Sequence, residues 1–271
     1  MFGRLNAWRR ERSARRLAIS DFQWQAAEAA LPCLAGLNAG ERDRLRELAR
    51  QFIADKQWSG AQGLELTAAI QLSIALQACL PILNLGLDWY AGWVGIVVYP
   101  GDFVIPRQIM DEDGVIHEYD DEVLGEAWDG GPVLLSWFAP GAQPEVVTAA
   151  GAAPIAIVIH EFAHKLDMQN GVADGMPPLH PGMQRHQWRE IFDTAFDDFN
   201  RRLDDGEDSA LDPYAADDPA EFFAVMSEAF FTQPGAVRDE YPAVYQALAA
   251  FYRQDPAARP GALPAAGALP E

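Results

Sequence analysis

Two histidines and a glutamate that could act together on a metal ion lie within one stretch, His160-Glu161-Phe162-Ala163-His164. On an α-helix, positions four apart lie on one face, about 6 Å apart along the axis, so His160 and His164 can both present imidazole nitrogens to one Zn²⁺. Glu161 is rotated off that face and can meet a water molecule held by the metal. Zinc lowers the pKa of bound water towards roughly 7, and a carboxylate beside it can take the proton as the water attacks a carbonyl group.

The neighbours of this stretch predict that it lies on a buried helix at about 153–167. Apolar residues recur around it with helix-like spacing, at Ile155, Val158, Ile159, Phe162 and Leu166. His-Glu-x-x-His on a helix is the signature of zinc metallopeptidases, and a chance match is expected in roughly one chain in 200 with this histidine content. Two histidines do not complete a catalytic zinc site, which also needs a third protein ligand.

A second predicted helix, at about 219–232, carries the candidates for the third ligand. Asp218 would be its N-cap and Pro219 its first helical residue. Glu221 and Glu228 are seven residues apart and therefore share a face of this helix. Asp218 and Glu221 also have the spacing of a capping box, in which the Glu221 carboxylate would accept a hydrogen bond from the N-cap amide. From spacing alone, coordination and capping are equally supported for Glu221, and Glu228 remains a rival ligand.

Long segments of the chain carry a family resemblance. They are residues 60–67, 77–80, 97–100, 125–128, 131–137 and 160–167, Tyr214 and residues 221–224. Together they resemble the Mlc titration factor A family of gluzincin metallopeptidases and, more distantly, the catalytic domain of anthrax lethal factor. The resemblance covers most of the chain, and only its ends diverge. In these families a tyrosine lies seven residues before the glutamate ligand, which is the separation of Tyr214 and Glu221.

This resemblance implies both site residues and functions. It implies that Glu221 is the third zinc ligand and that Tyr214 polarises the substrate carbonyl or stabilises the oxyanion, a role that suits a phenol donor. It also implies aminopeptidase-like hydrolysis of short peptides, in which Glu161 moves a proton to the leaving amine. The residues alone show no set of carboxylates that would select a free amino terminus.

The same family is named for binding Mlc, a glucose-responsive transcriptional repressor. The alternative function is therefore a regulatory binding protein that titrates a transcription factor and whose peptidase activity is secondary. A purely structural zinc site is less well supported, because such a site has no need for a base at Glu161 and usually has four protein ligands.

Other histidines and acids have weaker claims to the site. Asp167 lies three residues after His164 and could orient a ligand histidine, or be an ordinary acid at the helix end. His180 and His186 lie in or near a Pro/Gly-rich loop, where surface histidines without a functional role are the favoured interpretation. His117 follows an Asp-Gly turn and is expected to be a strand residue without chemistry.

The composition argues against several classes of protein. About half of the 271 residues are apolar, which predicts a folded core, and the net charge of −20 argues against binding to nucleic acid. Cys33 and Cys79 fit neither a disulfide framework nor a cysteine-zinc site. Residues 1–19 are rich in arginine but lack the apolar region of a secretory signal, and no apolar stretch is long enough to span a bilayer. We therefore expect a cytoplasmic protein that does not bind membranes.

The order of the predicted elements favours an α+β, zincin-like fold, in which a small sheet packs over the active-site helix. Helices are expected within 1–60 and at 67–80 (capped by Thr67), 184–203, 219–232 and 240–252, and strands at 93–99, 132–137 and in a hairpin at 104–119. Residues 133–137 are expected either at a sheet edge, where an extended peptide could pair with them, or in the sheet interior. We expect one catalytic domain over 1–254, helical to about residue 90, and a disordered tail over 255–271.

Overall fold

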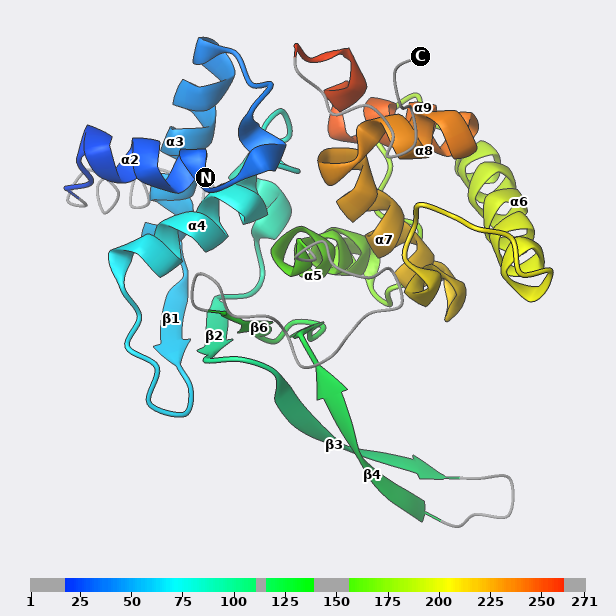
Figure 1. Cartoon of the computed structure of the whole chain (residues 1–271), viewed down its shortest axis with the longest axis horizontal. Helices are drawn as coiled ribbons and strands as arrows, with labels where there is room; N and C mark the ends of the chain where they lie inside the picture. The colour runs from blue at the N-terminus through cyan, green and yellow to red at the C-terminus, as the bar shows by residue number, and fades with distance from the viewer. Residues whose placement is uncertain (1–17, 111–115, 139–155, 261–271) are drawn as a thin grey trace.

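The computed structural model describes residues 18–110, 116–138 and 156–260, and for 106–110 and 116–122 it describes the backbone alone. Two groups of helices flank a central helix, α5 (Ile157–Asp167) (Figure 1). The N-terminal group is α2 (Asp21–Ala29), α3 (Ala39–Asp55) and α4 (Ala68–Cys79). The C-terminal group is α6 (Arg185–Asp204), α7 (Pro219–Thr232), α8 (Pro234–Glu240) and α9 (Pro242–Tyr252). None of the described helices is long and apolar enough to cross a membrane.

Side-chain caps begin two of these helices where the sequence predicts them. Thr67 accepts a hydrogen bond from an amide in the first turn of α4. Asp218 accepts hydrogen bonds from the amides of Ala220 and Glu221, and Pro219 is the first residue of α7. Pro suits this position because the first helical amide needs no intrahelical partner. The start of α7, and with it the position of Glu221, is therefore fixed by local sequence.

The sheet has the strand order β1–β2–β6–β5, and with the flanking helices it confirms the predicted α+β class. The strands are β1 (Gln57–Gly60), β2 (Gly95–Tyr99), β6 (Val133–Ser136) and β5 (Gly125–Ala127). β1, β2 and β6 are parallel to one another, whereas β5 is antiparallel to β6. The expectation that residues up to 60 are helical is wrong for β1. The chain becomes extended at Lys56, and pairing with β2 outweighs local helix preference.

Strand β6 is an interior strand and does not form the edge that was one of its two expected positions. It pairs with β2 on one side and β5 on the other, and all four of its residues are buried. Its expected role in pairing directly with a peptide is therefore excluded. Within the described part of the chain, the two edges of the sheet are β1 and the short strand β5.

A hairpin of β3 (Phe103–Met110) and β4 (Ile116–Val123) projects from the body of the protein (Figure 1). Its strands pair in antiparallel register, as predicted, and the expected turn at Asp113-Gly114 lies outside the described residues. His117 is a residue of β4, opposite Ile109, in agreement with its predicted place in a strand.

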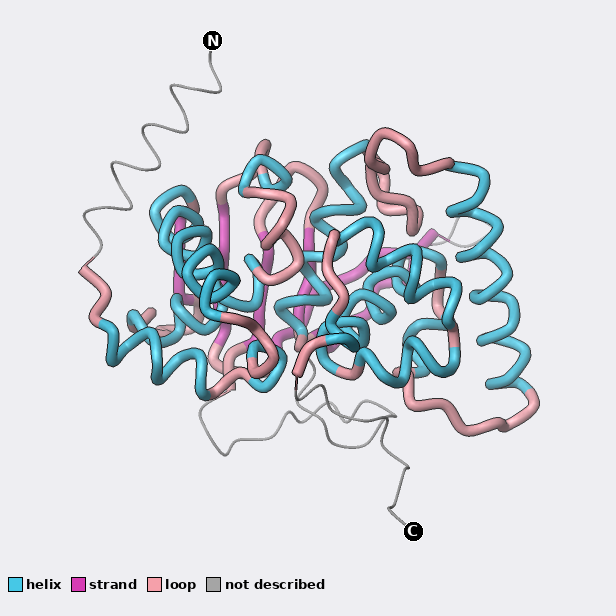
Figure 2. Tube along the Cα trace, turned by 90° about the horizontal axis from the view of Figure 1, so that it is seen from above, coloured by secondary structure: helices cyan, strands magenta, loops and turns pink. Residues whose placement is uncertain are grey.

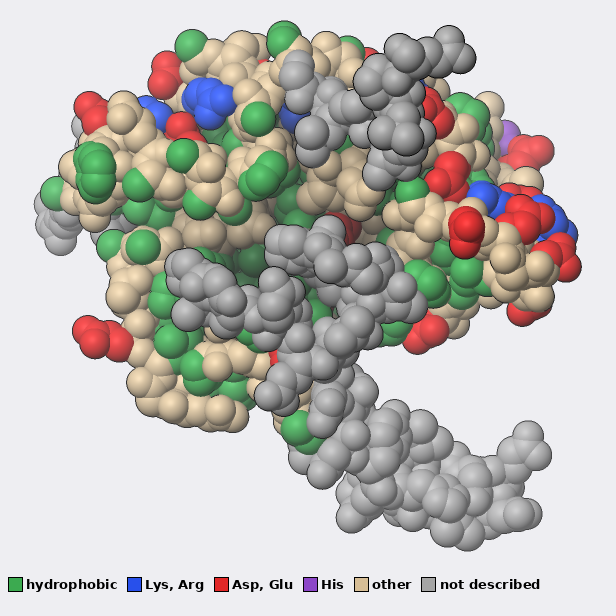
Figure 3. Space-filling view, viewed as in Figure 1, with side chains coloured by type: hydrophobic (Ala, Val, Ile, Leu, Met, Phe, Trp, Pro, Cys, Tyr) green, Lys and Arg blue, Asp and Glu red, His purple; other side chains and the backbone are tan. Residues whose placement is uncertain are grey.

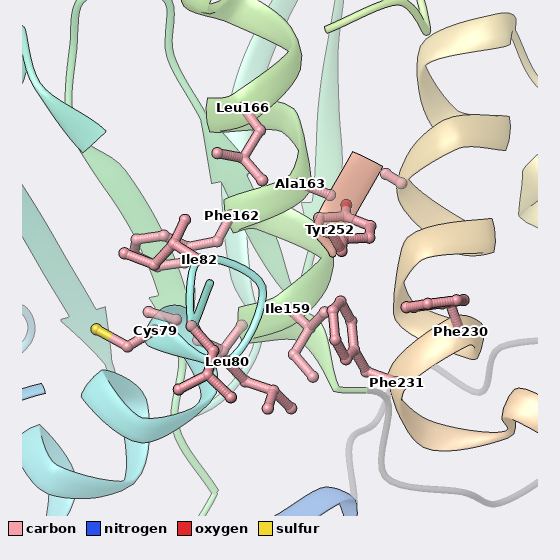
Figure 4. Packing of buried hydrophobic residues seen from close by; sticks show 14 of the residues in the cluster. Cys79, Leu80, Ile82, Ile159, Phe162, Ala163, Leu166, Phe230, Phe231 and Tyr252 are labelled. Atoms are coloured by element: carbon pink, nitrogen blue, oxygen red, sulfur yellow. The ribbon is translucent and has the colours of Figure 1, made fainter. Parts of the chain in front are cut away.

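Helix α5 lies in the core, and every residue from Val158 to Asp167 is buried. Figure 4 shows its apolar side chains between the chain after α4 on one side and α7 and α9 on the other. The Phe162 ring packs edge-on against Tyr90, with ring centroids 5.0 Å apart, and also contacts Phe52. Burying a phenylalanine side chain stabilises a fold by about 1.5–3 kcal/mol. The core therefore holds α5 firmly from several directions.

The C-terminal part differs from the sequence expectation in two places. The helix expected at 240–252 is present as α9, which begins at Pro242, and it is preceded by the short helix α8, which the sequence did not predict. Residues 256–258, expected to be disordered, form a short 3₁₀ helix in which Pro256 is buried. Figure 2 shows the C-terminal helices packed side by side, with the long helix α6 on the outside.

Candidate metal centre

Three possible metal-binding side chains from two helices converge beside the sheet. His160 and His164 project from successive turns of α5, and their Nε2 atoms lie 3.2 Å apart. Glu221 projects from the first turn of α7, and its Oε2 lies 3.1 Å from His160 Nε2 and 3.3 Å from His164 Nε2. Two elements separated by more than 50 residues in the sequence therefore bring two nitrogens and one oxygen to a single point.

The spacing of these three atoms fits one metal ion. Tetrahedral bonds of about 2.0–2.1 Å, which zinc makes to nitrogen and oxygen, separate neighbouring donor atoms by roughly 3.3 Å. Both imidazoles direct Nε2 inward, and a cation between them would interact favourably with both lone pairs. The histidine side chains are only 7% and 9% exposed, whereas that of Glu221 is 18% exposed. Two nitrogens, one carboxylate oxygen and a partly open side are the donor set of a catalytic zinc site.

The position of Glu221 distinguishes between the two interpretations of its spacing. Asp218 caps α7, but the Glu221 side chain does not turn back to complete a capping box; it points towards the histidines. Burial alone would raise the pKa of Glu221, but hydrogen bonds from His160 and His164 outweigh burial and lower it. Glu221 is therefore an anionic partner of both imidazoles.

Glu228 lies on the outer side of His160 and does not belong to the converging group. Its Oε2 is 3.7 Å from His160 Nδ1, and its Oε1 accepts a hydrogen bond from the amide of Ala156 at the start of α5. Burial lowers the pKa of His160, but the carboxylates of Glu221 and Glu228 outweigh it and raise the pKa to about 10 in the metal-free protein. Glu228 thus favours a proton on Nδ1, which leaves Nε2 for a metal.

Glu161 is buried one residue after His160, and it has an unusual environment for a carboxylate. Among the described residues, no group hydrogen-bonds to its Oε2. Burial raises the pKa of Glu161 to about 7, against the lowering effect of the two histidines. A buried carboxylate with an unpartnered oxygen and a pKa near neutrality is suited to accepting and returning a proton.

Gly125 is a site residue whose role the sequence did not reveal. A Cβ built on Gly125 would lie 2.5 Å from Glu161 Oε1, so only glycine lets β5 pass this close to the carboxylate. The sequence predicted no strand here and indicated Gly125 only as part of the segment 125–128 that carries the family resemblance, whereas a glycine within a strand often marks a close backbone approach. The strand β5 therefore lies directly beside the Glu161 carboxylate, and we call β5 the cleft strand.

Tyr214 lies on the open side of the converging group. It belongs to the 3₁₀ helix η4 (Pro213–Ala216), which is fixed at its start by a hydrogen bond from the Tyr214 amide to Asp212. The Tyr214 ring centroid is 6.2 Å from that of His160, and the residue is 48% exposed. The phenol ring therefore lies next to the histidines and is about half exposed.

Asp167 has a different contact from the one expected with a ligand histidine. Its Oδ2 accepts a hydrogen bond from the Gly175 amide, which ties the loop after α5 to the helix end. Within the described part of the chain, Asp167 Oδ1 and His164 Nδ1 are both buried without a hydrogen-bond partner. Asp167 is therefore a loop anchor in this structure.

The remaining histidines lie outside the converging group, as predicted. His180 Nε2 is 2.7 Å from the carbonyl oxygen of Phe251, and its ring packs edge-on against Trp89. His186 is exposed near the start of α6. Charged side chains gather on the end of the molecule near α6 (Figure 3), and several are paired in exposed ion pairs between Arg201 or Arg202 and nearby acids.

Comparisons with known proteins agree with this geometry. A family model described as glucose-regulated metallopeptidase M90 matches residues 5–253. Mlc titration factor A of Klebsiella pneumoniae subsp. pneumoniae is 37% identical over 242 residues, which are 89% of each chain. Mlc titration factor A of Salmonella arizonae is 38% identical over 242 residues, 89% of this chain and 94% of the relative. Because both the family model and these relatives match nearly the whole chain, the protein belongs to the glucose-regulated metallopeptidase M90 family.

Proposed function

We propose that this protein is a zinc-dependent peptidase with aminopeptidase-like action. Its metal ligands are His160, His164 and Glu221, its general base is Glu161, and its oxyanion donor is Tyr214. The observation that carries the proposal is the convergence of two imidazole nitrogens and a carboxylate oxygen within 4.8 Å of one another, next to the buried carboxylate of Glu161. Such a combination gives both a metal site and a proton acceptor, which a purely structural zinc site does not need.

Zinc is the metal that this donor set suits best. Two histidines and one glutamate form the ligand set of known zinc peptidases, and soft thiolates are absent from this group. When bound, zinc supplies a Lewis acid that polarises a carbonyl group and lowers the pKa of a water molecule. His160 is held for this task by Glu228, which keeps its Nε2 directed at the metal position.

Three side chains supply proton transfer, oxyanion stabilisation and a metal ligand: Glu161, Tyr214 and Glu221. Glu161 takes a proton from the attacking water and returns it to the leaving amine, a role that suits a buried carboxylate whose Oε2 has no hydrogen-bond partner among the described residues. Tyr214 donates its phenol proton in a hydrogen bond to the oxygen that becomes negative during attack. Glu221 contributes the carboxylate oxygen that lies beside both imidazoles.

The cleft strand supports a peptide as the substrate. Among the described strands β5 lies at an edge of the sheet, and an edge strand can pair with an extended chain through its outer backbone groups. Gly125 brings this edge next to Glu161, and a peptide paired with β5 would therefore pass the base. We therefore assign peptide pairing to β5 and not to residues 133–137.

The proposal is tested by peptide hydrolysis with zinc-loaded protein, metal-stripped protein and the variant Glu161→Gln. We expect the stripped protein to be inactive and to recover with zinc. We expect Glu161→Gln to bind zinc normally and to lose about 10²–10⁴-fold in kcat, the usual contribution of general acid–base catalysis. Undiminished hydrolysis by zinc-loaded Glu161→Gln would rule out the assigned base, and undiminished hydrolysis without metal would rule out a metallopeptidase.

The aminopeptidase part of the proposal needs its own experiment. Matched peptides with a free and an acetylated amino terminus should be compared under the same conditions. We expect cleavage of the first peptide bond in the free peptides and at least tenfold slower cleavage after acetylation. Equal rates, or cleavage in the middle of both peptides, would show an endopeptidase instead.

The role of Tyr214 predicts a smaller loss than the role of the base. Removing one oxyanion donor costs about 10²–10³ in kcat in other enzymes, and we expect Tyr214→Phe to lose about 10²-fold because the exposed site is partly solvated. Zinc content should not change. Tyr99→Phe, which alters a tyrosine stacked on Phe103, is the matched control and should keep full activity. A Tyr214→Phe variant as active as this control would remove Tyr214 from the mechanism.

A second function is suggested by the name of the relatives, Mlc titration factor A. We propose that this chain also binds an Mlc-like transcriptional repressor in the cytoplasm, where a repressor and peptides are both accessible. Its net charge of −20 suits a partner with a basic surface. The test is capture of the purified repressor by zinc-loaded and by metal-free protein. Binding by either form supports the proposal, and no binding by both contradicts it.

A further inference from the structure

A single lysine on α5 holds the turn that joins the cleft strand to the sheet. Lys165 Nζ donates hydrogen bonds to the carbonyl oxygens of Trp128, at 2.6 Å, and Gly131, at 3.0 Å. Both carbonyls belong to the connection between β5 and β6. Lys165 is 2% exposed and directly follows His164, so the ammonium reaches the turn from the same helix that carries the metal-binding histidines.

The turn held in this way is short and tightly built. The amide of Gly131 donates to the Trp128 carbonyl oxygen, and the amide of Trp128 donates to the carbonyl oxygen of Pro132. A Cβ on Gly131 would lie 2.9 Å from that of Trp128. Because the turn is compact, a hydrogen bond at its tip also restrains the strand that enters it.

The cleft strand has few other restraints. It has three residues, all partly exposed, and within the described sheet it pairs only with β6. Against the helix, the closest approach that bears on the site is at Gly125, where a Cβ would lie 2.5 Å from Glu161 Oε1. A small outward movement of β5 would therefore separate the edge from the base, and Lys165 restrains the opposite end of the strand from Gly125.

We propose that Lys165 is a positioning residue that fixes the cleft strand beside Glu161, so that a peptide paired with β5 lies at the correct distance from the base. This inference rests on the proposed peptidase function. It predicts that α5 carries the two histidine donors, the base and, one residue beyond His164, the anchor of the substrate-binding edge. Misplacement by about 1 Å can cost a factor of 10² in rate, so such an anchor has a measurable effect.

The molecule contains a matched control for this role. Lys56 is also buried, and its Nζ lies 3.8 Å from the centroid of the Trp93 ring, while Lys165 Nζ lies 4.7 Å from the same ring. Lys56 Nζ likewise donates to two backbone carbonyls, those of Tyr90 and Trp93, which precede β2. The two lysines therefore share their burial and their indole contact, but only Lys165 reaches the cleft strand.

The experiment compares Lys165→Met with Lys56→Met in the zinc-loaded full-length protein. Both variants remove a buried ammonium and its two hydrogen bonds to backbone carbonyls, so both should lose thermal stability. Only Lys165→Met should exchange amide hydrogens faster over residues 124–137, and only it should raise KM for peptides at least tenfold while zinc content is unchanged. Lys165→Arg, which keeps the donors, should restore most of the KM. Lys165→Gln gives a milder version of the same comparison if the Met variant does not fold.

The outcomes separate this inference from the proposed function. If the wild type hydrolyses no peptide, the proposed function fails, and amide exchange still tests the anchoring of β5. If the wild type is active but Lys165→Met and Lys56→Met have the same KM and the same exchange over 124–137, Lys165 is only a core residue and the inference is wrong. Faster exchange over 124–137 confined to Lys165→Met, with a raised KM, supports it.

Discussion

The helix pair α5–α7 and the hairpin β5–β6 form two sides of the same site, but they are built in opposite ways. In α5, every residue from Val158 to Asp167 is buried, and α7 contributes a further long buried face. The cleft strand β5 has three partly exposed residues and one neighbouring strand among the described residues. The helix pair is held by the core, whereas the cleft strand is held by its pairing with β6 and by contacts from α5.

This difference explains why the chemistry and the substrate edge depend on one another. The donors on α5 are placed by the helical period, which needs only local sequence. The position of β5 depends on Gly125 against Glu161 and on Lys165 at the turn, and both contacts join segments about 35 residues apart. A change in the hairpin β5–β6 should therefore lower the rate of hydrolysis without weakening metal binding. A change at Glu228, next to His160 Nδ1, should weaken metal binding directly.

The largest predicted effect in this comparison comes from Gly125→Ala. The added Cβ would lie 2.5 Å from Glu161 Oε1, so either the strand or the carboxylate must move. We expect a loss of about 10²-fold or more in kcat/KM with zinc content unchanged. Steady-state kinetics together with metal analysis measure both quantities. Gly40→Ala, at a helical position where the nearest contact of a Cβ is an ordinary 3.5 Å, is the control.

A Gly125→Ala variant with the activity of Gly40→Ala would show that the hairpin is not close enough to the base to matter. Loss of zinc from Gly125→Ala would contradict the expectation that the hairpin β5–β6 does not affect metal binding. It would mean that the metal ligands and the cleft strand are a single cooperative unit.

A loss of zinc affinity is expected from Glu228→Gln, which changes the carboxylate facing His160 Nδ1. The amide can still accept the hydrogen bond from Ala156, but it removes the negative charge that faces His160 Nδ1. Loss of such a partner of a ligand histidine typically costs 10–100-fold in metal affinity. Competition with a chromophoric zinc chelator measures this affinity. Glu207→Gln, which alters an exposed carboxylate paired with Arg201 and Arg202, should leave it unchanged. Equal affinities in the two variants would contradict the role of Glu228.

The smallest predicted effect concerns stability and Asp167. Burial raises the pKa of Asp167 from 3.8 to about 6, so between about pH 4 and 6 the folded protein holds more protons than the unfolded chain. The free energy of unfolding therefore decreases as pH rises through this window and then becomes constant for this group. Asp167→Asn removes the dependence while keeping an acceptor for the Gly175 amide.

The quantity compared is the free energy of unfolding of metal-free Asp167→Asn minus that of the metal-free wild type. We expect this difference to be larger at pH 8 than at pH 4.5 by on the order of 2 kcal/mol. Urea unfolding at the two pH values measures this change. A difference between the variants that is the same at both pH values would show that the buried carboxylate carries no such penalty.

Much of the helix pair could be predicted from sequence because its signals are local. The spacing of His160 and His164 predicted a shared face, and the cap at Asp218 with Pro219 predicted the start of α7 correctly. The choice between coordination and capping for Glu221 could not be made locally. It depends on which way one side chain turns, and the position of α5 determines that.

The hairpin could not be predicted in the same way. Residues 133–137 were equally compatible with an edge and an interior strand, because a short apolar run has no signal for its neighbours. β5 pairs with the outer side of β6. Its position depends on contacts with α5, at Gly125 beside Glu161 and at the turn that Lys165 binds, and these contacts have no local sequence signal. The short strand β1 was missed for a related reason, since only its pairing with β2 makes it extended.

The central claim is that one zinc ion binds between α5 and α7, and anomalous diffraction from zinc-loaded crystals tests it most directly. Data collected on both sides of the zinc absorption edge should give a single strong difference peak within about 2.0–2.2 Å of His160 Nε2, His164 Nε2 and a Glu221 carboxylate oxygen. A peak bound to other side chains, or no peak at this position in fully loaded protein, would contradict the account.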